Sequence, residues 1–121
     1  MNFFCRKRVK PLFTIAGFSA GYLIAKNNPD FTESALSVIN ALLNALKEGS
    51  DEEVMNALFR EAILDLVESN PPLQMNLLAI LDTIAFDIKA PEASKFSMTE
   101  LKAMICSFKN GLMAVKLEKA Q

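Results

Sequence analysis

The sequence of 121 residues contains no histidine, no tryptophan and only two cysteines. Without histidine, the chain cannot form a Ser-His or Cys-His nucleophile, a histidine-ligated zinc site or an imidazole pH switch. Cys5 and Cys106 are too few for a structural zinc site, and they could form a disulfide only in an oxidising compartment. No glycine-rich phosphate loop occurs either. We therefore expect no enzymatic activity, no cofactor, no bound metal and no small-molecule substrate.

Charged residues are unevenly distributed along the chain, although the formal net charge is only −1. Residues 1–29 contain five basic and no acidic residues, and residues 30–87 contain eleven acidic and two basic residues. Residues 88–121 contain six lysines and three glutamates. A basic head thus precedes an acidic middle and a mildly basic end. Because 51% of the residues are hydrophobic and 22% are charged, most of the chain is expected to fold.

Fifteen uncharged residues, from Pro11 to Ala25, follow the basic head. The segment Lys26-Asn27-Asn28-Pro29 comes next and is expected to end a helix there. The composition predicts an apolar helix over about 11–25. Gly17 and Gly21 are four residues apart and would give this helix a small-residue face that another helix could approach closely.

Three interpretations of residues 11–25 are open. In the first, the helix is a single-pass membrane anchor with its N-terminus in the cytoplasm, although a spanning helix needs roughly 20 apolar residues. In the second, it is part of a cleaved signal peptide, with Ser19-Ala20-Gly21 as the cleavage site. In the third, it is a core helix of a soluble cytoplasmic bundle. We divide the chain into a head and apolar helix at 1–29 and a helical-bundle domain at 30–121.

The rest of the chain has the i, i+3, i+4, i+7 hydrophobic spacing of amphipathic helices, and no alternating strand pattern. We therefore expect an all-α fold, a bundle of four amphipathic helices in addition to the N-terminal apolar helix. The four are expected at about 32–48, 51–69, 72–89 and 98–117. The helix at 72–89 is apolar around most of its girth, which predicts that it is the central helix or presents a second face to a partner.

Polar residues mark the ends of these helices. Ser50 with Glu53, and Ser97 with Glu100, have the spacing of capping boxes. The turn before the 51–69 helix is very short, which predicts an antiparallel hairpin with the helix that precedes it. Gly111 weakens the last helix by about 1 kcal/mol relative to alanine, and we expect close packing at this position.

Six residues are candidates for contact with a partner: Gly17, Gly21, Leu77, Lys102, Lys109 and Lys116. The two glycines form the small-residue face, the leucine lies on the most apolar helix, and the three lysines recur every seven residues along one helix. Because the middle of the chain is acidic and the lysines lack a helix-turn-helix context, we do not expect nucleic-acid binding.

These features favour a small, non-enzymatic helical-bundle protein that acts through contacts with a protein partner or with a second copy of itself. In the anchor interpretation, residues 11–25 also tether it to a membrane. One alternative is a soluble helical regulator or inhibitor in which residues 11–25 are a core helix. Another is a secreted effector, or a virion-type structural component that forms oligomers.

Overall fold

All regular elements in the part of the chain that the structure describes are helices. The computed structural model describes residues 11–47, 51–90 and 93–120. The α-helices there are α1 (Pro11–Asn27), α2 (Thr32–Lys47), α3 (Glu52–Ser69), α4 (Gln74–Thr83) and α5 (Met98–Ala120). Two short 3-10 helices, η2 (Pro29–Phe31) and η3 (Pro71–Leu73), precede α2 and α4. The predicted all-α class is confirmed.

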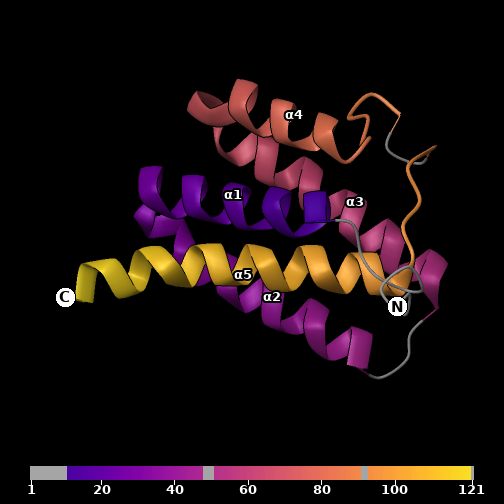
Figure 1. Ribbon diagram of the computed structural model, residues 1–121, viewed down its shortest axis with the longest axis horizontal. Helices are drawn as coiled ribbons and strands as arrows, with labels where there is room; N and C mark the ends of the chain where they lie inside the picture. Colours follow the sequence, from indigo (N-terminus) through magenta and orange to yellow (C-terminus); the bar gives the residue numbers. More distant parts are fainter. Residues whose placement is uncertain (1–10, 48–50, 91–92, 121) are drawn as a thin grey trace, which may run out of the picture.

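The fold is built around α1 and α5, two helices that are far apart in the sequence and run parallel, side by side (Figure 1). Gly17 of α1 faces the carbonyl of Met104, and Gly21 faces that of Phe108, so both helices advance in the same direction. Gly111 of α5 in turn faces the backbone of α1. Three glycines therefore let the two backbones meet with no side chain between them. The close packing expected at Gly111 is confirmed.

The remaining helices pack around this pair. α2 contacts α5, whereas α4 contacts α1 and α3, which itself contacts α5 (Figure 1). α2 and α3 do not pack along each other, so the predicted antiparallel hairpin is wrong. The apolar stripe of α2 is largely buried, and that of α3 is buried at Met55, Phe59 and Val67. On α5, the side chains of Leu101 and Leu112 are completely inaccessible to solvent. α5, and not the helix predicted at 72–89, is the central helix of the described fold.

α4 ends at Thr83, well before the predicted end near residue 89. Ala85 has a left-handed backbone with a φ of 59°, and the Phe86 N–H donates to the Leu81 carbonyl at 3.0 Å. A second bond, from the Ala85 N–H to the carbonyl of Asp82, completes a Schellman motif. Glycine is the usual residue at the left-handed position of this motif, and its absence here explains why the sequence pattern did not predict the helix end.

A cluster of phenylalanine rings accounts for the turn at Ala85. The Phe96 ring lies at the middle of this cluster, with its centroid 5.9 Å from that of Phe13, 5.8 Å from Phe59 and 6.5 Å from Phe86. All four rings are buried. The end of α4 allows Phe86 to enter the cluster, and the burial of an aromatic side chain offsets the left-handed backbone of Ala85.

A buried amide positions Phe96. The side chain of Asn56 on α3 accepts a hydrogen bond from the Phe96 N–H at 2.9 Å and donates to the Phe96 carbonyl at 2.8 Å. It also donates to the carbonyl of Glu52 at 3.0 Å. Because Asn56 is buried and its amide group is fully satisfied, it fixes the segment before α5 against α3.

The helix caps agree with the sequence at one of the two predicted positions. At the start of α5, the Glu100 N–H donates to the Ser97 hydroxyl at 3.1 Å and the Ser97 N–H donates to the Glu100 carboxylate at 2.8 Å. This capping box is confirmed. The cap of α3 is Asp51, which accepts from the Glu53 N–H at 2.9 Å, and not the predicted Ser50, which lies outside the described residues.

Candidate functional site

The outer face of α1 carries large apolar side chains in solvent. Leu12, Ile15 and Phe18 are spaced three residues apart and are 48%, 58% and 40% exposed. The opposite face of the same helix is buried and includes Phe13 and Ile24. α1 is therefore apolar on both faces, and only one of them is covered by the described part of the chain.

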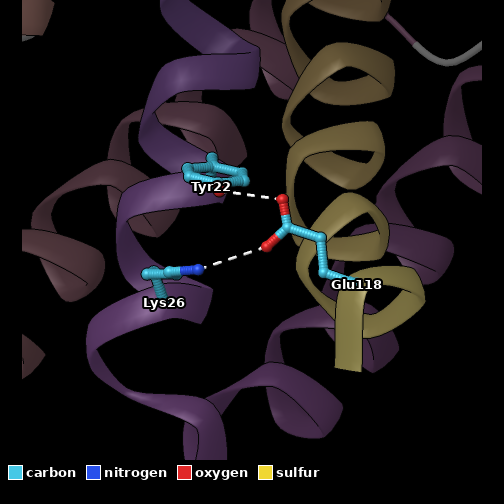
Figure 2. Close-up of polar contacts among 3 residues, drawn as sticks. All are labelled: Tyr22, Lys26 and Glu118. Atoms are coloured by element: carbon cyan, nitrogen blue, oxygen red, sulfur yellow. Dashed lines mark hydrogen bonds and ion pairs between the residues drawn. The ribbon is translucent and has the colours of Figure 1, made fainter. Parts of the chain in front are cut away.

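A polar cluster lies at the C-terminal end of this face (Figure 2). The Tyr22 hydroxyl donates to one Glu118 carboxylate oxygen at 2.9 Å, and the Lys26 ammonium donates to the other at 3.2 Å. The ammonium group lies 5.7 Å from the centroid of the Tyr22 ring. This ring stacks on the ring of Phe18, and the two centroids are 6.2 Å apart. These contacts connect the last turns of α1 to the last turns of α5.

The charges in this cluster shift one another. The pKa of Glu118 is lowered because Tyr22 and then Lys26 donate hydrogen bonds to its carboxylate. The pKa of Lys26 is raised, mainly by its hydrogen bond to Glu118 and the attraction of that charge. Both groups lie at the surface, where solvent screens their interaction, so the cluster orients side chains more than it stabilises the fold.

α4 also has two apolar faces. Leu77 and Leu81 are buried, whereas Met75, at 81% exposure, together with the exposed Leu78 and Ala79, lies on the other side. Leu77 was the residue that the sequence pattern selected on this helix, and the structure places it in the core. The exposed residues could have been found from the same helical spacing, because the residues on either side of the core stripe are apolar as well.

Beneath α4, an apolar cavity of about 70 Å³ lies where the helices converge. Its walls include Ala20 of α1, Ala62 and Ile63 of α3, and Leu77 and Ile80 of α4. An ordered water needs two to four polar partners, which this lining does not offer, and an engineered cavity that binds benzene measures roughly 150 Å³. Residues of α2 and α5 complete the lining, so the cavity indicates loose packing where α3 and α4 meet the other helices.

The structure does not bring the six predicted contact residues together. Gly17 and Gly21 are buried where α1 meets α5, and Leu77 lines the cavity. Lys102 and Lys116 are exposed on α5, and Lys109 is half-buried. Lys116 forms an ion pair with Glu33 of α2 at 2.9 Å. A role of any of the six in partner contact stays a prediction.

The segment Gly17-Phe18-Ser19-Ala20-Gly21 also matches the GxSxG pattern of a nucleophile elbow, a match that is missed when the glycines are considered only as a small-residue face. In that motif the serine lies on a sharp turn between a strand and a helix. Here the five residues lie inside α1, and both glycines are in contact with α5. The spacing serves helix packing in this chain.

Two further kinds of site are absent from the described residues. No group of three or more Cys, Asp or Glu side chains in this part of the chain is arranged to hold a metal ion. Across the same residues, no helix combines the length and the apolar character needed to cross a membrane. Cys106 is a half-buried free thiol, and Cys5 lies outside the described residues.

Comparison of the chain with protein-family models, with curated proteins and with solved structures finds no match. Function is therefore inferred from the geometry of this chain alone. The features that stand out are the exposed apolar faces of α1 and α4.

Proposed function

We propose that this chain is a non-enzymatic helical-bundle protein that acts by contact with another protein, and that the outer face of α4 is the contact surface. The observation that carries this proposal is the 81% exposure of Met75 on a helix whose opposite face closes the core. Leu78 and Ala79 extend the exposed face along the helix.

The chemistry of this face supports a protein partner. Methionine is flexible and polarisable, so it adapts to different apolar surfaces, and exposed apolar patches mark interaction sites. Asp82 lies seven residues after Met75, on the same side of α4, and is exposed. An apolar centre with a charged edge is the usual composition of a protein interface.

In this proposal α1 is a core helix. Its buried residues Phe13, Ala16 and Ile24, and its glycine contacts with α5, support the interpretation of residues 11–25 as part of the bundle. The domain proposed for residues 30–121 then includes α1 in its core. This arrangement corresponds to the helical regulator among the functions considered from the sequence.

Site-specific photo-crosslinking tests the contact. A photoreactive phenylalanine analogue is placed at Met75 or Leu78 of the full chain, and at Val38 as the control. Val38 is an apolar residue of α2 that is 53% exposed. We expect positions 75 and 78 to give the same discrete adduct in cells and position 38 to give none. Excess unlabelled chain should compete for the adduct, whereas the Met75→Glu variant should not.

The purified chain is irradiated alone in parallel. An adduct between two copies would identify the partner as a second copy of this chain. Equal labelling from positions 75 and 38, or no discrete adduct from position 75, would contradict the proposal.

A further inference from the structure

The outer face of α1 combines apolar exposure with positive charge at its start. Four basic residues lie just before Pro11, namely Arg6, Lys7, Arg8 and Lys10, and the first acidic residue of the chain is Asp30. All four lie within five residues of Pro11 in the sequence. In the sequence, positive charge therefore directly precedes the helix on which Leu12 and Ile15 are exposed.

We propose that the outer face of α1 lies on the surface of an anionic lipid bilayer. An interfacial helix lies in the plane of the membrane, with apolar side chains in the boundary between headgroups and acyl chains. Leu12, Ile15 and Phe18 supply these side chains, and the basic residues before Pro11 supply the attraction to anionic headgroups. The buried face of α1 stays on α5, so the folded bundle binds the membrane without releasing a helix.

Both contributions are needed for binding. A single myristoyl chain gives only marginal, reversible binding to a membrane. Three partly exposed side chains insert less apolar surface than a myristoyl chain does, so they do not hold the protein on a membrane by themselves. Each Lys or Arg near an anionic surface adds about 1 kcal/mol. Lys26, at the other end of the face, is paired with Glu118 and adds little. The electrostatic attraction is therefore concentrated at the N-terminal end of α1.

A bilayer fits this face better than a protein surface does. The outward positions Leu12, Ile15 and Phe18 present hydrocarbon and an aromatic ring, and no acidic residue lies between Pro11 and Asn27. The carboxylate at the C-terminal end of the face, Glu118 of α5, is paired with Lys26. A protein interface usually combines an apolar centre with a polar rim and about one hydrogen bond per 100–200 Å². This inference concerns a different surface from α4 and does not rest on the proposed protein contact there.

Vesicle flotation with the full chain tests the inference. The vesicles are phosphatidylcholine alone, or phosphatidylcholine with phosphatidylserine as a minor component. The variants are Ile15→Asn and, as a control of similar exposure on another helix, Val38→Asn. A third variant replaces Arg6, Lys7 and Arg8 with glutamine. Circular dichroism checks that each variant keeps its helical content.

We expect the unmodified chain and Val38→Asn to float only with the anionic vesicles, and to be released by salt. Ile15→Asn should bind at least about tenfold more weakly. The triple glutamine variant should bind on the order of 100-fold more weakly, since three charges at about 1 kcal/mol each combine to that factor.

Three results would overturn the inference. The first is no flotation with anionic vesicles, and the second is equal flotation with both compositions. The third is unchanged binding by Ile15→Asn. If the chain is instead a dimer in light scattering, and Ile15→Asn makes it monomeric while no vesicle binds, a second copy covers the face. Met75→Glu should leave flotation unchanged, so this test fails or succeeds independently of the contact proposed for α4.

Discussion

The contact between α1 and α5 and the contact between α4 and the rest of the bundle are both apolar, but they differ in packing. Between α1 and α5 the backbones touch, and a Cβ atom at Gly17 would lie 2.5 Å from the Met104 carbonyl oxygen. Beneath α4 a cavity of about 70 Å³ is left open. Gly17 also lines this cavity, so the tight contact with α5 and the loose packing toward α4 lie on adjacent sides of α1.

The difference matters for stability. Close packing gains dispersion energy at many atoms, whereas a void forfeits it on its whole lining. The α1–α5 pair should therefore be the most stable unit of the fold, and α4 should open more readily.

The largest effect is expected where the helices touch. Gly21→Val places a branched side chain against the backbone of Phe108, so the helices must separate, and we expect a loss of about 3 kcal/mol in the free energy of unfolding. Thr14→Val, an exposed position on the same helix, should change it by less than about 0.5 kcal/mol. Urea unfolding followed by circular dichroism measures both. Equal stabilities of the two variants would show that α1 and α5 are not in close contact.

Enlarging a side chain should change the free energy of unfolding in opposite directions in the two regions. Ala62→Met extends a side chain into the cavity and should raise the free energy of unfolding by about 0.5–1.5 kcal/mol. Ala25→Met, at a fully packed position of α1, should lower it by about 1–3 kcal/mol. The same urea titration compares them. A loss of stability in both variants would mean that the space under α4 is filled.

A substitution at the end of α4 should give a smaller gain in stability. Ala85→Gly removes a Cβ atom from a left-handed position, and we expect the free energy of unfolding to rise by about 0.5–1 kcal/mol. Ala79→Gly makes the same chemical change inside α4 and should lower it by about 0.5–1 kcal/mol. Thermal unfolding by calorimetry shows the two signs. A destabilising Ala85→Gly would mean that α4 continues beyond Thr83.

The smallest effect is expected from the exposed polar cluster at the end of α1. Because the pKa of Glu118 is lowered in the folded state, its carboxylate stabilises the fold at pH values above the ordinary carboxyl pKa of about 4. This stabilisation is lost as the pH falls through the lower pKa of the folded state. The raised pKa of Lys26 has the opposite consequence, a contribution that is lost as the pH rises through the raised value.

The Glu118→Gln variant tests this dependence. Thermal unfolding should show the variant slightly less stable than the unmodified chain near neutral pH, with a difference that disappears in acid and shrinks in high salt. A difference that persists unchanged in acid would assign the role of Glu118 to shape and hydrogen bonding in place of charge.

Local patterns were sufficient to predict the fold class and most helix bounds. Hydrophobic spacing located α2, α3 and α5, and the pair Ser97 and Glu100 marked the start of α5, because these features depend only on residues a few positions apart. The parallel pairing of α1 with α5 was not predicted. Gly17, Gly21 and Gly111 indicated close approach, but their partner is set by the tertiary structure of the whole chain.

The end of α4 and its exposed face were missed for a related reason. Ala85 is a poor residue for a left-handed helix end, and the burial of Phe86 against rings from two other segments favours it. Likewise, the spacing in α4 does not show which of its two apolar faces is covered. Leu77 was the predicted contact on this helix, but the packing of α4 against α1 and α3 buries it and leaves Met75 exposed.

Amide hydrogen exchange of the full chain tests most directly the claim that α1 belongs to the tightly packed centre while α4 is loosely held. We expect amides in the middle of α1 and α5 to exchange together and slowest, through global unfolding. Amides of α4 should exchange at least about tenfold faster, through local opening. Exchange of α1 at the rate of α4 or faster, with α5 still protected, would contradict this account.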